Sequence, residues 1–154
     1  MRNVRLDWKG PYSKEQVIQM TGDDDFGVYQ VIGTHVVFGH NSLLYIGRAV
    51  GVKFGDRFRA HEDWLKYESG IQIYLAKPRE GDFKEDDKWE DWDQLVRDCE
   101  ALCIYWHSPP YNSKGLNRYN GPDLRIHNRG ERGSLLPDIT SDWKPSRPQD
   151  DDAN

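Results

Sequence analysis

Two apolar runs rich in β-branched and aromatic residues stand close together in the first third of the chain. VYQVIGTHVVF begins at Val28 and LLYIG begins at Leu43, with the turn-forming residues GHNS between them. Runs of this composition on either side of a turn cluster predict a β-hairpin. A third run, IQIYLA from Ile71, predicts another strand.

Three other segments carry the spacing of helices. The sequence SKEQ at Ser13 forms a capping box, which predicts a short helix over 14–20. Over 52–67, apolar residues recur every three to four positions, and over 89–106 they form a single stripe. The pair Pro109-Pro110 then prevents the last helix from continuing.

The rest of the chain is polar. Residues 1–12 are interpreted as a polar lead-in that contains a turn, and 113–140 as turns rich in Gly, Asn and Arg. At 154 residues the chain fits one domain, expected over 1–140, and 141–154 is expected to be a disordered polar tail.

The composition predicts a cytoplasmic location. Only 36% of residues are apolar, and no apolar run reaches the length of a membrane span. The first residues, MRNVRLDWKGPYS, lack the apolar core of a signal peptide. No membrane contact is therefore expected.

The charge is distributed unevenly. The formal net charge is -5, which argues against binding to nucleic acid. Residues 81–93 contribute -5 and residues 141–154 contribute -2, so the remainder carries +2. This balance permits binding to nucleic acid, and weak or partner-assisted binding is expected because phosphate neutralisation drives affinity.

Several short motifs occur in a particular order. The predicted hairpin holds GVY, ending at Tyr29, and YIG, beginning at Tyr45. The next helix carries Arg57 and, four positions later, His61; the last helix carries Glu100, and Asn112 follows twelve positions later. Together these motifs resemble those of the GIY-YIG nuclease family, and the resemblance covers 26–112. The sixteen positions between the two tyrosines exceed the family's usual hairpin length.

The resemblance implies an α/β fold of the α+β kind, with a three-stranded antiparallel sheet flanked by helices. It also implies a metal-dependent endonuclease that hydrolyses phosphodiester bonds, with DNA as the expected nucleic acid and Mg²⁺ or Mn²⁺ as the cofactor. Glu100 would hold the metal. The catalytic residues that it implies are Tyr29, Tyr45, Arg57, His61, Glu100 and Asn112.

The residues themselves support this chemistry to different degrees. Glu100 can supply the single carboxylate that a hard divalent ion takes while keeping several waters, but its helical position also suits a surface glutamate. Arg57 offers a planar fork for a phosphate and is equally suited to a surface salt bridge. His61 is either a proton donor or a histidine at the edge of the core.

The tyrosines and the asparagine have alternatives of their own. The family assigns water activation to the first tyrosine, here Tyr29. With an ordinary pKa of about 10 it is a poor base, unless a metal and Arg57 lower that pKa. Tyr29 and Tyr45 would otherwise pack a core. The amide of Asn112 suits bracing of the site better than chemistry. Other cations form a candidate nucleic-acid-binding rim: Arg48, Lys53 and Arg59, with Arg129 and Arg132 as an extension.

Two alternatives remain beside the endonuclease. One is a catalytically weak, nuclease-derived DNA-binding or protein-interaction module, in which the acidic segment 81–93 contacts a partner or shields the active face. The other is a small restriction or mobile-element enzyme, in which a homodimer supplies the second cut on duplex DNA. The chain contains no Walker A loop, CxxC pair, HExxH or GxSxG motif.

Overall fold

The computed structural model describes residues 1–60, 68, 70–80 and 89–143. His61, the acidic stretch 81–88 and most of the predicted tail lie outside these residues. The elements follow one another in the order β1 (Arg2–Tyr12), α1 (Lys14–Ile18), β2 (Gly27–His35), β3 (Gly39–Ala49), α2 (Phe54–Ala60), β4 (Gln72–Glu80), α3 (Trp89–His107), β5 (Leu124–Gly130) and β6 (Asp138–Thr140).

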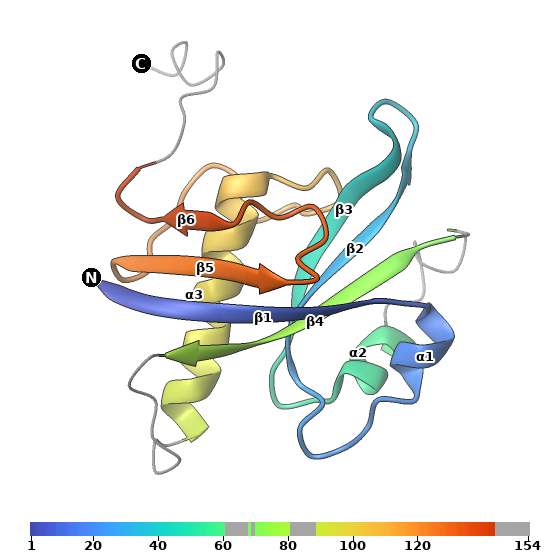
Figure 1. Cartoon of the computed structure of the whole chain (residues 1–154), viewed down its shortest axis with the longest axis horizontal. Helices are drawn as coiled ribbons and strands as arrows, with labels where there is room; N and C mark the ends of the chain where they lie inside the picture. The colour runs from blue at the N-terminus through green and yellow to red at the C-terminus, as the bar shows by residue number, and fades with distance from the viewer. Residues whose placement is uncertain (61–67, 69, 81–88, 144–154) are drawn as a thin grey trace.

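The strands form one sheet in the order β3-β2-β4-β1-β5-β6. Neighbouring strands are antiparallel except β1 and β5, which are parallel. The sheet curls strongly, so that β2 and β3 run steeply across the direction of β1 and β5 (Figure 1). The expected three-stranded antiparallel sheet flanked by helices is therefore wrong, because β1, β5 and β6 extend it to a mixed sheet of six strands.

The two segments interpreted as irregular supply these additional strands. In β1, Val4, Leu6 and Trp8 alternate inward and are buried, while the residues between them are more exposed. In β5 the third inward position is Asn128, whose side-chain oxygen accepts a hydrogen bond from the Trp8 indole at 2.8 Å. A polar inward residue of this kind weakens the alternation on which strand prediction depends.

Helices cover both faces of the sheet beside β2. Val28 faces a core shared with α3, whereas Tyr29 and Val31 face a second core that contains Phe54 and Phe58 of α2. Both faces of β2 are thus buried, which explains its nearly continuous apolar run. The strand carries the first tyrosine into the second core.

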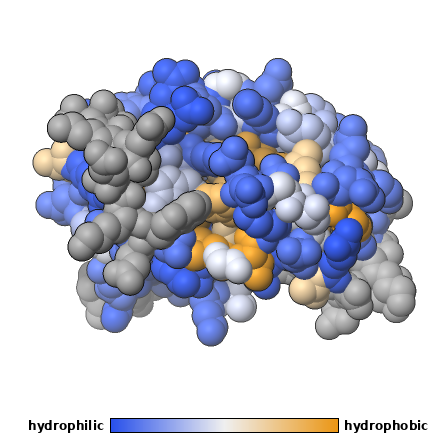
Figure 2. All heavy atoms as spheres, turned by 90° about the horizontal axis from the view of Figure 1, so that it is seen from below, coloured by the Kyte–Doolittle hydropathy of each residue, from blue (hydrophilic) through white to orange (hydrophobic). Residues whose placement is uncertain are grey.

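The surface agrees with the low mean hydropathy of -0.89. Figure 2 shows a face that is mostly hydrophilic, with hydrophobic side chains gathered near its centre. In the part of the chain that the structure describes, no helix has both the length and the apolar character needed to cross a membrane.

Candidate active site

A cleft of about 460 Å³ lies beside β3, at one end of the strand order. Its walls come from β3, α2, α3 and the segment that follows α3. Because β3 is an edge strand, side chains from both faces of the sheet can reach the same space. Five of the residues predicted from the sequence line this cleft: Tyr45, Arg48, Arg57, Glu100 and Asn112.

The tyrosines of the two motifs lie on the same face of the hairpin. Tyr29 pairs with Gly47 across the strands, so Tyr45 is its diagonal neighbour, and the two ring centroids are 6.0 Å apart. A Cβ placed on Gly47 would lie 2.4 Å from the Tyr29 hydroxyl oxygen. Only a glycine at this position leaves room for the ring.

Arg57 joins the two tyrosines to the cleft. It hydrogen-bonds with the side chains of both Tyr29 and Tyr45. Burial lowers the pKa of Arg57, but its interactions with the two tyrosines outweigh burial and raise that pKa overall. The guanidinium therefore stays charged and is held in place from the sheet side.

Tyr29 is fully buried in the second core. Burial, followed by the neighbouring Tyr45, raises the pKa of Tyr29 far above its ordinary value, and Arg57 counteracts only part of this rise. The hydroxyl is therefore protonated at neutral pH. This is the opposite of the lowered pKa that water activation requires.

Glu100 reaches the cleft from α3 and is 8% exposed. Its Oε1 accepts a hydrogen bond from Arg48 Nη1 at 2.6 Å. Burial raises the pKa of Glu100 above its ordinary value, and the charges of Arg48, Arg57 and Arg97 oppose this rise. The carboxylate thus sits in a desolvated but strongly cationic environment.

Asn112 braces the cleft, as the chemistry of its amide suggests. The Ile46 backbone N–H donates to Asn112 Oδ1 at 3.0 Å, and Asn112 Nδ2 donates to the Ile46 carbonyl at 2.8 Å. The adjacent Tyr111 N–H donates to the Leu44 carbonyl at 2.9 Å. These three bonds attach the segment after α3 to the outer edge of β3.

Other predicted residues lie away from this cleft. Lys53 donates to the Asp23 carbonyl and sits 5.4 Å from the centre of the Phe26 ring. Arg59 Nη2 donates to the Ile18 carbonyl, on α1. His61 lies outside the described residues, so its place in the site remains a sequence prediction.

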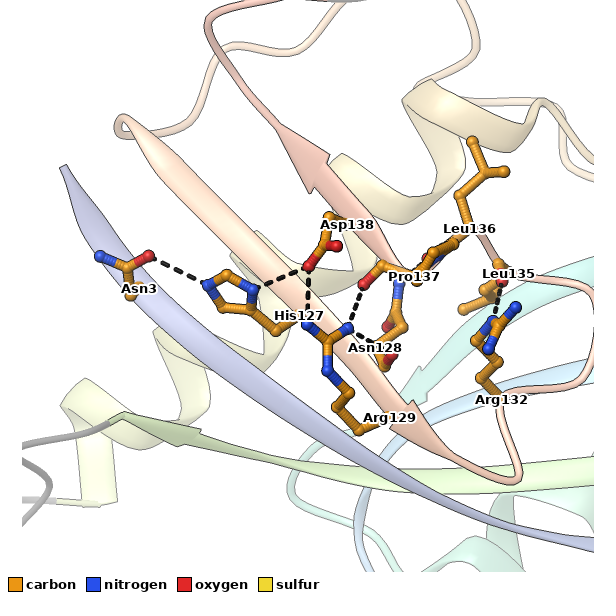
Figure 3. Close-up of polar contacts among 9 residues, drawn as sticks. All are labelled: Asn3, His127, Asn128, Arg129, Arg132, Leu135, Leu136, Pro137 and Asp138. Atoms are coloured by element: carbon orange, nitrogen blue, oxygen red, sulfur yellow. Dashed lines mark hydrogen bonds and ion pairs between the residues drawn. The ribbon is translucent and has the colours of Figure 1, made fainter.

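Arg129 and Arg132 belong to the β5–β6 region instead. Figure 3 shows Arg129 beside Asp138, where Nη2 and Oδ1 are 2.9 Å apart, while Arg132 Nε donates to the Leu135 carbonyl. Hydrogen bonds from His127, and then from Arg129, lower the pKa of Asp138. These arginines stabilise local structure and do not line the cleft.

Two cations that line the cleft were missed from the sequence, Arg97 and Lys114. Arg97 lies three positions before Glu100 on α3, so helical spacing alone places the two side chains on one face. Lys114 follows Asn112 by two positions, in a segment where no periodic pattern gave a signal. Four cationic side chains therefore line the cleft, and Glu100 is the one acidic side chain among its described lining residues.

A second cleft of about 710 Å³ is lined by residues of β1, α3 and the segment that follows α3. Arg97 lines both clefts, and the second one adds Arg2 and Arg118. Asp98 also lies there and accepts a hydrogen bond from Gln94 at 2.9 Å. Arg97 is the residue that the two clefts share, and arginines outnumber acidic residues in the described lining of each cleft.

Among the described residues that line the cleft, Glu100 alone carries a carboxylate that could hold a hard divalent cation. Within the described residues, no group of three or more His, Cys, Asp or Glu side chains could hold a metal. A magnesium ion is nevertheless commonly held by one or two carboxylates, with water and phosphate oxygens completing its shell. Glu100 fits that arrangement provided that Arg48 yields the oxygen it now contacts.

Comparisons with protein-family models, with curated proteins and with solved structures found no match to this chain. The functional interpretation consequently depends on the residues that meet in the cleft.

Proposed function

We propose that this protein is a metal-dependent endonuclease that hydrolyses phosphodiester bonds of nucleic acid in the cleft beside β3. The observation that carries the proposal is the meeting of Tyr45, Arg57 and Glu100, which come from three elements, in one cleft. The cationic surface around them suits a polyanion, because neutralising phosphates releases bound counterions.

Arg57 is the residue assigned to the scissile phosphate. Its guanidinium is held by two tyrosines and lines the cleft. A planar, permanently charged fork can bind two phosphate oxygens and stabilise the charge that develops on them during hydrolysis. Arg48 and Arg97 lie beside it and contact neighbouring phosphate oxygens in this proposal.

Glu100 is assigned to holding Mg²⁺ or Mn²⁺. When bound, such a cation neutralises charge on the phosphate and makes a water easier to deprotonate. Substrate phosphate competes with Glu100 for Arg48, so substrate binding itself would release the carboxylate from its ion pair. This exchange explains how a paired glutamate can serve as a ligand.

The two tyrosines take different roles. Water activation by Tyr29 would require loss of its proton, which burial opposes. We therefore assign Tyr29 to positioning Arg57 and assign Tyr45, which lines the cleft, to contacting water or substrate. Proton transfer by His61 stays part of the proposal on the basis of sequence alone.

A second candidate is a catalytically weak module that binds nucleic acid without cutting it. The short Arg48–Glu100 contact favours this candidate, because it already neutralises the carboxylate that would hold the metal. The cationic surface serves both candidates equally. Only cleavage separates them.

The test uses the purified full-length chain with plasmid and with labelled single strands, in Mg²⁺ or Mn²⁺ at low salt. The endonuclease proposal predicts cleavage by the wild type and loss of cleavage in Glu100→Ala and Arg57→Ala. A shift in gel mobility without cleavage by any of the proteins would replace this proposal with the binding module. Neither cleavage nor a shift in gel mobility by the wild type would remove both candidates.

A further inference from the structure

Three consecutive apolar residues form the turn between β2 and β3. Val36, Val37 and Phe38 are 98%, 76% and 68% exposed. Single exposed apolar residues are ordinary on protein surfaces, whereas a contiguous group of large ones typically marks a binding site. The hairpin that carries them projects beyond the rest of the sheet (Figure 1).

Hydrogen bonds hold this turn in one conformation. His35 Nδ1 accepts from the backbone N–H groups of Val37 and Phe38 at 3.1 and 3.2 Å. On the returning strand, Ser42 Oγ donates to the Gly39 carbonyl at 2.7 Å. The apolar side chains are therefore presented outward by an ordered turn.

The aromatic rings continue from the turn to the cleft. His35 stacks on Phe38, with centroids 4.7 Å apart and planes inclined by 24°. The Tyr111 ring lies 5.9 Å from the His35 ring, measured between centroids, and Tyr111 also lines the cleft. We call Phe38, His35 and Tyr111 the aromatic track.

We propose that the aromatic track stacks against unpaired bases of the nucleic acid whose phosphate lies in the cleft, so that single-stranded or locally unpaired segments are the preferred substrate. This inference rests on the proposed function. Every base has a π face, so aromatic side chains hold single strands with little regard to sequence. Bases inside an intact duplex are already stacked on one another and offer no free face to the track.

The neighbouring charges favour this ligand over an apolar one. Tyr111 lines a cleft that also carries Arg48, Arg57, Arg97 and Lys114. A surface in which aromatic rings adjoin a cationic cleft can bind both the bases and the phosphates of a single strand. A purely apolar protein partner would leave the adjoining cations without counter-charges.

The test measures fluorescence anisotropy of a labelled single strand and of the matched duplex in EDTA, which prevents cleavage. Phe38→Ala and Phe38→Leu remove the ring from an exposed position, and Leu136→Ala, at a 47% exposed residue outside the track, is the control. Both Phe38 variants are expected to bind the single strand about tenfold more weakly. Duplex binding should change less than twofold, and the control should match the wild type.

Phe38→Leu distinguishes stacking from simple apolar contact, because leucine keeps the apolar surface but lacks a π face. Wild-type affinity in Phe38→Leu, or equal losses for single strand and duplex, would overturn the proposal. Arg57→Ala distinguishes failure of the aromatic track from failure of the proposed function. Weaker binding in Arg57→Ala with no effect of either Phe38 variant would overturn the track alone, whereas no binding of any nucleic acid by the wild type would overturn the proposed function as well.

Discussion

Glu100 is a buried acidic residue, and its burial determines how its contribution to stability changes with pH. Burial raises the pKa of Glu100 in the folded state, although the nearby arginines oppose it. A raised folded-state pKa means that the group's contribution to stability is full below the unfolded pKa and is lost as pH rises through the folded one. Ionisation of Glu100 in the folded state therefore lowers stability.

Glu100→Gln tests whether the Arg48–Glu100 pair is needed for stability. The amide removes the buried charge and can still accept a hydrogen bond from Arg48, so the free energy of unfolding at neutral pH is expected to stay within about 1 kcal/mol of wild type or to exceed it. Urea unfolding measures this, with the exposed Glu131→Gln as the control. A loss of about 3 kcal/mol would show that the Arg48–Glu100 pair serves mainly to stabilise the fold.

The structure brings several of the residues that the motif order singled out into one cleft. Tyr45, Arg57 and Glu100 meet although they come from separate elements. The sequence could not indicate that Arg48 pairs with Glu100, because that contact spans 52 positions. Core packing of Tyr29 was one of two alternatives at the sequence level, and only the fold decides it, because the ring packs on residues of α2.

Among the elements, those with local signals were predicted well. The capping box at Ser13 is present, and α3 over Trp89–His107 lies within one residue of its predicted bounds. Helix α1 ends at Ile18, two residues before its predicted end. These features depend on the spacing of residues within one or two helical turns, and this spacing can be seen directly in the sequence.

Strands β1 and β5 were missed because their support is distant in sequence. They pair in parallel, with Arg2 opposite Leu124, so more than a hundred residues separate the partners. Charged residues alternate with the few apolar ones in β1, and Asn128 takes an inward position in β5. Tertiary pairing decided the structure of both segments.

Asn112 is the side chain through which the segment after α3 supports β3. Asn112→Ala would remove both bonds to Ile46 and leave buried backbone groups unsatisfied, so a loss of about 1–3 kcal/mol in the free energy of unfolding is expected. Urea unfolding measures it, and Asn120→Ala, at an exposed position, controls for loss of an asparagine. A loss below about 0.5 kcal/mol would contradict the bracing role.

The end of α3 carries a histidine that should make stability depend on pH. Leu136 N–H donates to His107 Nε2 at 2.9 Å, so this nitrogen must be unprotonated, and Nδ1 contacts the Cys103 carbonyl at 2.8 Å. Burial lowers the pKa of His107, although the Cys103 contact opposes it. A lowered pKa in the folded state means that stability from this group is present above the unfolded pKa and is lost as pH falls through the folded one.

The contribution of His107 to stability should therefore fall between about pH 7.5 and pH 5.5, because protonation breaks the bond to Leu136. His107→Gln cannot titrate, so the wild type should lose more stability, or gain less, than this variant over the same range. Urea unfolding at both pH values provides the comparison. Identical changes in the two proteins would exclude a contribution of His107 to the pH dependence.

At the scale of the whole molecule, charge is segregated. The net charge is -5, yet the cleft beside β3 and the one that shares Arg97 with it are cationic. Net charge alone argued against nucleic-acid binding, because it averages over segments such as 81–93. The fold class was predicted wrongly because the resemblance covers 26–112 and gives no information on the strands outside that range.

The central claim is that the cleft beside β3 cuts nucleic acid, and single-turnover cleavage of a labelled single strand in Mg²⁺ tests it most directly. Wild type should cleave, and Arg57→Ala should do so at least about a hundredfold more slowly, because removal of a preorganised charge contact to the phosphate typically costs that much. Arg125→Ala, at an exposed position on β5, should retain the wild-type rate. Equal rates for the wild type and Arg57→Ala, or no cleavage by the wild type, would contradict the account.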